Sequence, residues 1–387
     1  MKILAVDRSA KFYGSAIDYM RIASHFKRIG QSCELILAED GPFVNECTKR
    51  ELSVSIFKLP NRLNKYGRNI FNITQLPLNI VALFIYNLKF TKFIWNNKIN
   101  SCDDLIYINN YRTFVYYFLA ILLTRIKGHK IILKLQTSDM PLFFFKVLSL
   151  LLPCKVLISG TEMYAKNNLG YLHTLFSRKI ECLPSSVDTN RFKPCTTNMK
   201  LALRTRHGFP VEHYTFISVG SIEPRKGTID LLKAFSSIGS DDVCLLHVGG
   251  HSEEYIDYYN EVCNISRMDP RIKMLGKRND VEELLNASDC FILNSESEGM
   301  PNSIVEAMSC GLPVICSNIA SNPEVVTSNI GVLIEYGDRD ALIGAMYSFY
   351  NHDIKVNFDR NVIRATVKSN YSLSSWLTRK TNIFLNI

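Results

Sequence analysis

Residues 290–317 read CFILNSESEGMPNSIVEAMSCGLPVICS, and this stretch decides the fold. It opens with an apolar run typical of a buried strand and continues through a polar loop. Pro301 and Asn302 then supply start signals for a helix. Gly311 and Pro313 end that helix before a second β-branched run. A strand, a helix and a second strand in this order predict a parallel β-α-β unit.

The same alternation extends over the whole chain. Strands are predicted in the first half at residues 2–6, 33–38, 54–59, 104–108, 130–135, 155–159 and 179–183. In the second half they are predicted at residues 215–219, 244–248, 272–275, 290–293, 314–317 and 331–334. Amphipathic helical patterns lie between them, for example at residues 17–28, 229–236, 255–266 and 341–350. Nearly all-apolar strands alternating with helices predict parallel sheets covered on both faces.

The alternation restarts in the middle of the chain. Residues 184–210 are rich in Pro, Ser, Thr, Asn and basic residues, and we place a linker at about 190–208. The sequence therefore predicts an α/β protein of two doubly wound, Rossmann-like domains facing a central cleft. Ligands of such sheets bind at the carboxyl ends of the strands.

The cysteines and the apolar runs indicate in which cellular compartment the protein is expected. The 11 cysteines contain no C-x-x-C pair, which is typical neither of a disulfide framework nor of a zinc site, and we expect a reducing cytosol. No secretory signal is expected at residues 1–7, which look like a first strand. The longest unbroken apolar runs, at 114–124 and 142–152, fall short of the ~20 residues that span a bilayer. We therefore expect no transmembrane anchor.

The charge is unevenly distributed along the chain. Residues 1–195 carry 27 Lys and Arg against 13 Asp and Glu, whereas the remainder carries 18 against 23. The basic charge of residues 1–195, combined with apolar runs near 69–95, 114–124 and 142–152, suggests an anionic partner. This partner would be either a membrane surface or nucleic acid. Solvated lysines without any such partner would explain the same counts.

Two glutamates flank the helix start in the opening stretch. The free amides of that start favour a negatively charged ligand. Glu298 lies in the loop before the helix and Glu306 about one turn inside it. Carboxylates only accept hydrogen bonds and so suit the hydroxyls of a sugar. Amides for phosphate and carboxylates for hydroxyls together describe a nucleotide-sugar, although two glutamates at this spacing are by themselves more often solvated charges.

A second candidate element is FISVGSIEPRKGT at residues 216–228. A predicted buried strand runs into Gly220, where the backbone can approach a ligand closely. Arg225 and Lys226 follow before the next helix and can neutralise a departing diphosphate. Taken alone, such a basic pair is usually solvated.

Other nucleotide-binding or catalytic signatures are weak or missing. A loop with Gly14 follows the first predicted strand and could face a phosphate. It is not a G-x-G-x-x-G fingerprint, and no P-loop, H-E-x-x-H or G-x-S-x-G motif occurs.

Taken together, these elements resemble the retaining family-4 glycosyltransferases of the GT-B fold (glycosyl transferases group 1). In that family an E-x₇-E pair, here Glu298 and Glu306, and a basic pair, here Arg225 and Lys226, form the donor site. Order, spacing and strand-helix pattern agree in segments 219–235, 278–289 and 295–315.

The resemblance implies a domain assignment. Residues 1–195 would form the acceptor-binding domain and residues 205–368 the domain that binds the nucleotide-sugar donor. Residues 369–387 would form a last helix that crosses back onto the first domain. The acceptor would be a glycan, lipid-linked, in cell-surface polysaccharide synthesis such as O-antigen, capsule or exopolysaccharide. The protein would be cytoplasmic and peripheral on the inner face of an anionic membrane, without a nucleic-acid partner.

The resemblance also implies a mechanism: a hexose or N-acetylhexosamine is transferred with retention, without a metal or other cofactor. Arg225 and Lys226 would stabilise the departing nucleoside diphosphate, Glu298 would hold the sugar hydroxyls, and Glu306 the ribose. Gln136 stands where many members have a histidine; either it contacts a sugar hydroxyl or a nearby polar residue serves. The remaining expected donor contacts are Gly14, Gly220, Ser221, Gly299, Met300, Pro301, Asn302 and Ser303.

Two other functions fit parts of the pattern. A sugar-nucleotide epimerase of similar two-domain shape would use the same diphosphate site, but we identify no convincing acid/base pair over a sugar ring. A basic nucleic-acid-binding or scaffold protein would fit the charge of residues 1–195. The charges are dispersed, however, and no nucleic-acid-binding motif is present.

Overall fold

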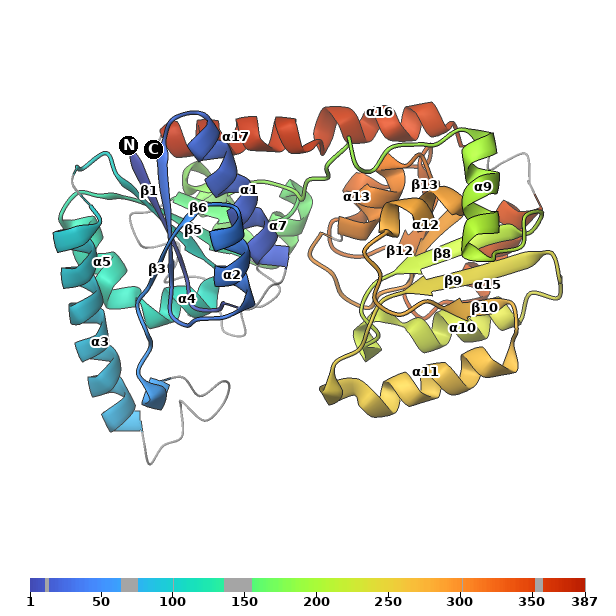
Figure 1. Cartoon of the computed structure of the whole chain (residues 1–387), viewed down its shortest axis with the longest axis horizontal. Coiled ribbons are helices and arrows are strands. Elements are labelled where there is room, and N and C mark those ends of the chain that lie inside the picture. Colours follow the sequence, from blue (N-terminus) through green and yellow to red (C-terminus); the bar gives the residue numbers. More distant parts are fainter. Residues whose placement is uncertain are drawn as a thin grey trace. The chain divides into compact units, whose positions relative to one another are not determined.

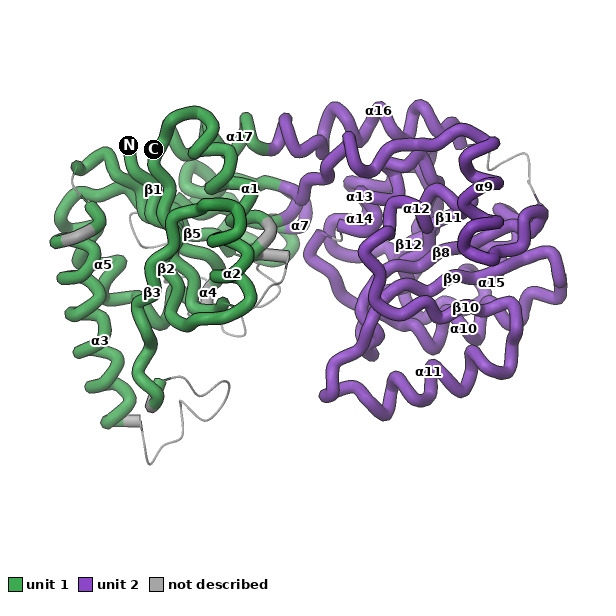
Figure 2. The backbone as a smooth tube through the Cα atoms, in the orientation of Figure 1, with its two compact units in different colours: residues 1–159, 165–183, 377–387 green, residues 160–164, 184–376 purple. Residues whose placement is uncertain are grey.

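The computed structural model describes residues 1–10, 14–63, 76–99, 101–135, 155–300, 302–351 and 358–386. These form two compact units, shown in Figures 1 and 2. Unit 1 comprises residues 1–159, 165–183 and 377–387, and unit 2 comprises residues 160–164 and 184–376. Each unit holds one sheet whose strand pairs are all parallel, which confirms the predicted α/β class with two Rossmann-like domains.

The sheet of unit 1 has the strand order β3-β2-β1-β4-β5-β6-β7. Its strands are β1 (Lys2–Asp7), β2 (Ser32–Leu37), β3 (Ser53–Ile56), β4 (Leu105–Asn109), β5 (Lys130–Leu135), β6 (Lys155–Ile158) and β7 (Ile180–Cys182). The order reverses direction between β1 and β4, so the sheet is doubly wound around that point.

The sheet of unit 2 has the order β10-β9-β8-β11-β12-β13. Its strands are β8 (Tyr214–Val219), β9 (Val243–Val248), β10 (Ile272–Met274), β11 (Cys290–Leu293), β12 (Val314–Ser317) and β13 (Gly331–Ile334). Here the order reverses between β8 and β11. Every strand predicted from the sequence is present, with ends shifted by at most a few residues.

Helices connect the strands. Up to residue 183 they are α1 (Gly14–Arg28), α2 (Pro42–Lys49), α3 (Leu76–Asn97), α4 (Tyr111–Tyr116), α5 (Phe118–Ile126), α7 (Glu162–Leu169) and α8 (Tyr171–Leu175), with 3₁₀ turns η1 (Asn61–Leu63) and η4 (Ser177–Lys179). Beyond it they are α9 (Thr197–His207), α10 (Thr228–Ser236), α11 (Ile256–Met268), α12 (Val281–Ala287), α13 (Asn302–Ser309), α14 (Asn322–Val325), α15 (Arg339–Tyr350), α16 (Arg360–Asn370) and α17 (Leu373–Leu385), with η5 (Pro224–Lys226) and η6 (Glu253–Tyr255).

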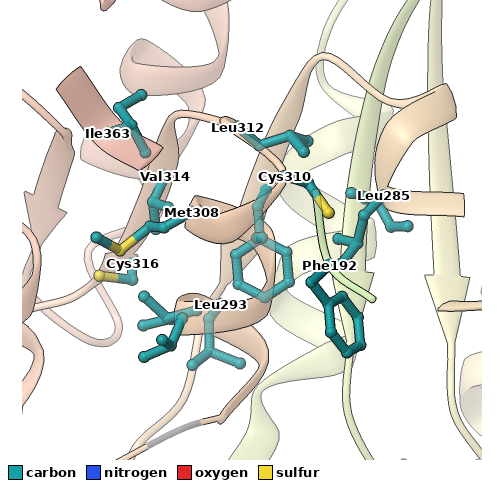
Figure 3. Close-up of a cluster of buried hydrophobic side chains, with 14 of the residues drawn as sticks. Phe192, Leu285, Leu293, Met308, Cys310, Leu312, Val314, Cys316 and Ile363 are labelled. Carbon is teal, nitrogen blue, oxygen red and sulfur yellow. The ribbon is translucent and has the colours of Figure 1, made fainter. Parts of the chain in front are cut away.

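Both faces of the second sheet are buried. Because successive side chains of a strand point to opposite faces, Phe216 and Ile217 of β8 belong to two different hydrophobic clusters. Figure 3 shows one of them, in which Met308 of α13 and Val314 of β12 lie close to Ile363 of α16. This two-sided burial explains why the strands read as unbroken apolar runs rather than as alternating ones.

The predicted linker differs from the structure. Residues 197–207 form α9, whose N-cap Thr196 accepts from the N–H of Met199 and which ends at Gly208 in the left-handed conformation. Its buried Arg204 donates to the carbonyl of Ala287 and forms an ion pair with Asp289. The polar composition of this segment therefore marks a surface helix held by ion pairs rather than a free connection.

The boundary between the units also differs from the predicted one. Residues 184–195 belong to unit 2 rather than to the first domain. Val187 pairs with Ser372 in an isolated parallel bridge, and Phe192 is buried in the hydrophobic cluster of unit 2. Ser309 of α13 donates to the Phe192 carbonyl at 2.6 Å. These contacts attach the segment to unit 2.

The last helix contributes to both units, because α17 begins in unit 2 and its residues from 377 onward belong to unit 1. Phe384 is fully buried and stacks on Phe26 of α1 at 5.7 Å between ring centroids. Lys380 is 1% exposed and donates to the hydroxyl of Tyr107 at 3.1 Å. Burial, reinforced by the charge of Lys134, lowers the pKa of Lys380 well below its usual range. The end of the chain is thus built into the core of unit 1.

Helix α3 is longer and more apolar than the sequence analysis recognised. Among the described residues it is the one helix whose length and composition, over Pro77–Asn96, would allow it to cross a membrane. About a third of that window is buried within the protein. The longest apolar segment is therefore this one and not residues 114–124, which are divided between α4 and α5. The run at 142–152 lies outside the described residues.

Candidate active site

The candidate site lies where the strand order of unit 2 reverses. Strands β8 and β11 are neighbours there, although seven other elements separate them in sequence. The loop after β8 carries Gly220 to Gly227, and the loop after β11 carries Asn294 to Met300. Because both strands end at the same edge of a parallel sheet, the two loops come together at the switch point, where ligands of such sheets bind.

Gly227 lets the two loops pack closely. It has a positive φ of 57°, between η5 and α10. A Cβ at this position would lie 2.2 Å from the carbonyl oxygen of Asn294, the first residue after β11. The backbone N–H of Glu296 also donates to the carbonyl of Arg225 at 2.7 Å. The loops are therefore joined backbone to backbone, which fixes where η5 presents its side chains.

An ion-pair cluster bridges the two loops. Lys226 Nζ donates to Glu298 Oε1 at 2.5 Å, and Arg225 Nη1 lies 3.6 Å from Glu298 Oε2. Arg225 Nη1 also donates to the carbonyl of Ser297 at 3.1 Å. The Glu298 side chain is 8% exposed and that of Lys226 14%, whereas Arg225 is 43% exposed. The structure thus brings together the three residues predicted to be catalytic, 72 positions apart in sequence.

Glu223 is a member of this cluster that the sequence analysis did not assign. Its Oε1 accepts from Arg225 Nη2 at 2.6 Å and from Ser221 Oγ at 2.6 Å. Glu223 therefore holds the guanidinium beside Glu298, and Ser221, predicted to contact the donor, supports Glu223. The only signal in the sequence is a Glu two residues before the Arg, which is too common to be informative.

The backbones of Gly220 and Gly249 are in direct contact at the base of the site. Gly220 donates its N–H to the carbonyl of Val248, and a Cβ at Gly249 would lie 1.7 Å from the Gly220 oxygen. The side chain of Lys226 passes over this contact, because a Cβ at Gly220 would lie 3.8 Å from its Cδ. A side chain at Gly249 would displace the Gly220 backbone, at the start of the loop that carries Lys226.

Replacing Gly249 by alanine is expected to destabilise the fold by about 3 kcal/mol, because the added methyl group overlaps a carbonyl oxygen that cannot rotate away. Urea unfolding followed by circular dichroism measures the change. Gly239→Ala is the matched control, since nothing lies within 4 Å of a Cβ there. Equal stabilities of the two variants would show that the Gly220 loop is not packed as described.

The other predicted donor contacts follow along the chain. Gly299 lies near Tyr164, whose hydroxyl would be 3.9 Å from a Cβ at Gly299. Met300 packs against the hydrophobic cluster of unit 2, and its Sδ accepts from the N–H of Ser185 at 3.0 Å. Met300 therefore anchors the loop to the core, which leaves its backbone rather than its side chain for a ligand.

Helix α13 begins at Asn302, which is exposed, and continues through the half-buried Ser303. Glu306 lies on the same helix, also half-buried. Its charge contributes to raising the pKa of the Arg191 guanidinium, after the larger effect of the hydrogen bond that Arg191 donates to Glu282. Glu306 thus lies within electrostatic reach of Arg191.

Three predicted contacts are not placed with this cluster. Pro301 and Gln136 lie outside the described residues. Gly14 is the first residue of α1, in unit 1. Seven positions before Gly14, β1 ends in Asp7, which is 5% exposed and accepts from Asn109 Nδ2 at 2.6 Å.

A buried histidine lies beneath the site and makes stability depend on pH. His247 of β9 is 2% exposed, and burial lowers its pKa from 6.5 to about 4, against a smaller opposing effect of the Gly220 backbone. The folded imidazole is therefore neutral where the unfolded one takes up a proton. Because the unfolded state binds more protons between these two pKa values, acid favours unfolding.

Between pH 7 and pH 5 we expect His247 to account for a loss of about 2 kcal/mol of unfolding free energy. Urea unfolding of the wild type and of His247→Gln at both pH values isolates this contribution. The variant should lose less stability on acidification than the wild type. Parallel pH dependences would mean that the imidazole is protonated in the folded state.

Comparison with known proteins agrees with this geometry. Residues 199–367 match the family described as glycosyl transferases group 1. The UDP-Gal:alpha-D-GlcNAc-diphosphoundecaprenol alpha-1,3-galactosyltransferase of Escherichia coli is 34% identical over 175 residues, 43% of this chain and 44% of that protein. The GDP-mannose-dependent monoacylated alpha-(1-6)-phosphatidylinositol monomannoside mannosyltransferase of Corynebacterium glutamicum is 30% identical over 214 residues, 52% and 55% of the two chains. The chain thus spans about half the length of the curated relatives it matches.

Solved structures are similar in fold to this chain over both of its units. Anabaena Alr3699/HepE, crystallised in complex with UDP, superposes with a TM-score of 0.81 over 100% of both chains at 19% identity. A glycosyltransferase from Rickettsia africae gives a TM-score of 0.80 over 99% of this chain, also at 19% identity. Sequence match and fold agree: residues 199–367 are similar to the glycosyl transferases group 1, and both units share the two-domain fold of the solved glycosyltransferases.

Proposed function

We propose that this protein is a retaining, metal-independent glycosyltransferase that moves a hexose or N-acetylhexosamine from a nucleotide-diphosphate sugar to a hydroxyl of a lipid-linked glycan. The observation that carries the proposal is the cluster of Arg225, Lys226 and Glu298 at the β8–β11 switch point. It sets two cations and one carboxylate where a parallel sheet binds its ligand, as a diphosphate joined to a sugar requires.

Each side chain has a distinct task in this reaction. The cations of Arg225 and Lys226 stabilise the negative charge that develops on the diphosphate as the bond to the sugar breaks. Glu298 accepts hydrogen bonds from the hydroxyls of the transferred sugar, and Glu306 from those of the ribose. The amides in the first turn of α13 add partial positive charge near the phosphates. The acceptor hydroxyl attacks from the face that the diphosphate leaves, which retains the anomeric configuration.

The activities of the relatives support a lipid-linked acceptor. The E. coli relative acts on a GlcNAc-diphosphoundecaprenol, and the C. glutamicum relative on a phosphatidylinositol monomannoside. Their donors, UDP-Gal and GDP-mannose, carry different bases and sugars. We therefore propose the class of acceptor, with synthesis at the cytoplasmic face of the membrane for a cell-surface polysaccharide, and leave the donor to be identified by binding.

A thermal-shift screen of the common nucleotide-sugars tests the donor site. A donor present at 100 times its dissociation constant should add about 2.7 kcal/mol to the stability of the protein. The bound donor is then incubated with lipid-linked glycan acceptors, and transfer is followed by mass spectrometry. No shift with any nucleotide-sugar would contradict the proposal, and conversion of the donor to an isomer without acceptor would favour an epimerase.

Stereochemistry and metal dependence are tested on the same reaction. NMR of the product should show the anomeric configuration of the donor, and transfer should proceed at an unchanged rate in EDTA. An inverted product or a rate restored only by a divalent cation would contradict the corresponding part of the proposal.

A further inference from the structure

Helix α3 of unit 1 is apolar on its outward face as well as on its buried one. Its buried face carries Tyr86, Phe90 and Ile94 together with the polar residues Asn79, Asn87 and Thr91, each at most 5% exposed. Its outward face carries large apolar side chains that are between 44% and 57% exposed, namely Leu78, Ile80, Val81, Phe84, Ile85 and Leu88. We call these six residues the α3 face. Surface helices normally carry polar side chains on their outward face.

Hydrogen bonds fix this orientation of the helix. Asn87 Nδ2 donates to the carbonyl of Tyr116 at 2.9 Å, and its Oδ1 accepts from the N–H of Ala120 in α5 at 3.0 Å. One position earlier, the buried hydroxyl of Tyr86 bonds that of Tyr117 at 2.8 Å. Rotating α3 to hide its apolar face would break these bonds and expose unsatisfied polar groups. The outward apolar face is therefore a consequence of how the helix is held.

The apolar surface continues from α3 onto its neighbours. In Figure 1, α3 runs beside α5 at the edge of unit 1. Between them lies a pocket of about 300 Å³, lined by Ile80, Phe84, Phe114, Phe118 and others. Ile126, at the end of α5, is 74% exposed. An exposed apolar surface of this kind marks a contact site for another protein or for a membrane.

The charges around the α3 face are of one sign. Residues 52–138 contain twelve Lys and Arg but only two acidic residues, Asp103 and Asp104. Lys89 and Lys92 follow Leu88 on α3, and both are exposed. Helices α3, α4 and α5 contain no Asp or Glu. An apolar stripe edged by cations matches the two layers of an anionic membrane, hydrocarbon beneath and phosphate above.

We propose that the α3 face is a membrane-docking surface that lies in the headgroup region of a bilayer containing anionic lipid. The apolar side chains enter the boundary of the hydrocarbon, and Lys89 and Lys92 bind lipid phosphates. The helix lies on the membrane and does not span it, because spanning would remove Asn87 and Tyr86 from their partners in unit 1. The docking proposal does not depend on the proposed function. The further statement that docking brings unit 1 to a lipid-linked acceptor rests on the proposed function.

Insertion of the face is tested by a probe within it. In Phe84→Trp an indole replaces a side chain that is 53% exposed, and vesicles of phosphatidylglycerol and phosphatidylethanolamine with brominated acyl chains are then added. We expect blue-shifted and quenched emission beyond that of the wild type, whose tryptophans are Trp95 and Trp376. Emission identical to that in buffer would overturn the proposal.

Binding is measured by flotation with the same lipids, unbrominated. Phe84→Ser/Ile85→Ser should weaken binding at least tenfold. Lys89→Gln/Lys92→Gln should weaken it about fivefold per lysine, and only with anionic vesicles at low salt. The matched control is Tyr347→Ser/Val362→Ser, which removes two apolar residues that are 57% and 41% exposed on unit 2. Equal binding of this control and of Phe84→Ser/Ile85→Ser would overturn the assignment.

Two further outcomes distinguish the alternatives. If the α3 face joins two copies of the chain, sedimentation equilibrium without lipid will show a dimer that Phe84→Ser/Ile85→Ser dissociates, and the docking proposal fails. If the docking variant transfers sugar normally to a water-soluble acceptor but not to a vesicle-embedded one, both proposals stand. Vesicle binding without any nucleotide-sugar binding would leave docking intact and refute the proposed function.

Discussion

Replacing Lys226 by alanine is expected to slow sugar transfer about 10³-fold, or about 4 kcal/mol in the barrier, because it removes a cation placed to stabilise the departing diphosphate. The side chain is 14% exposed and lies over Gly220, so little water can take its place. Steady-state rates with the donor found by thermal shift measure the effect. The loss should fall on kcat, since the charge on the diphosphate grows in the transition state.

The matched control for this variant is Lys233→Ala. Lys233 lies in α10 of the same unit and pairs with Glu261 at 3.8 Å, with its side chain 47% exposed. It should transfer sugar at the wild-type rate. A rate for Lys226→Ala within a fewfold of this control would remove Lys226 from the reaction and, with it, the observation on which the proposed function rests.

Replacing Glu298 by alanine should affect two ligands in opposite directions. The transferred sugar loses an acceptor for its hydroxyls, each such charged hydrogen bond contributing about 1.5–3 kcal/mol, so turnover should fall by about 10²–10³-fold. The free nucleoside diphosphate, which has no sugar, should bind as tightly as before or more tightly. The reason is that Lys226 and Arg225 no longer have a carboxylate that competes with the phosphates.

Titration calorimetry with the diphosphate and rate measurements with the donor test this divergence. A double-mutant cycle of Lys226→Ala and Glu298→Ala should show strong coupling, whereas Lys233→Ala and Glu261→Ala, an exposed pair in the same unit, should be additive. If Glu298→Ala weakened the binding of the diphosphate as much as that of the donor, Glu298 would act by holding the loop and not by binding the sugar.

The sheets of this protein could be predicted from sequence because their strands are buried on both faces. A run such as Cys290–Leu293 has no polar position, and a glycine or a loop of polar residues ends it. Such a pattern leaves little choice of structure. The doubly wound class could be predicted in the same way, whereas the order of the strands and the meeting of the loops after β8 and β11 come from the structure.

Elements that break the usual patterns could not be predicted in this way. Helix α3 has large apolar residues on its exposed face and both aromatic residues and asparagines on its buried face, so its sequence shows no clear apolar side. Helix α9 looks like a linker because Asp289, with which its Arg204 pairs, is 85 positions away in sequence. In the site, Arg225, Lys226 and Glu298 were identified by chemistry and spacing, whereas Glu223 depends on side-chain geometry that no spacing encodes.

The return of residues 377–387 to unit 1 has a consequence for the order in which the protein is made. Unit 1 contains β1, which is synthesised before every strand of unit 2, yet Lys380 and Phe384 belong to its interior. Unit 2, whose residues run only to 376, has its full sequence earlier. Nascent domains usually complete folding from the amino end onward. Here the core of unit 1, which is synthesised first, stays incomplete until translation has reached the last turns of α17. Only then can Phe384 pack against Phe26 and Tyr107.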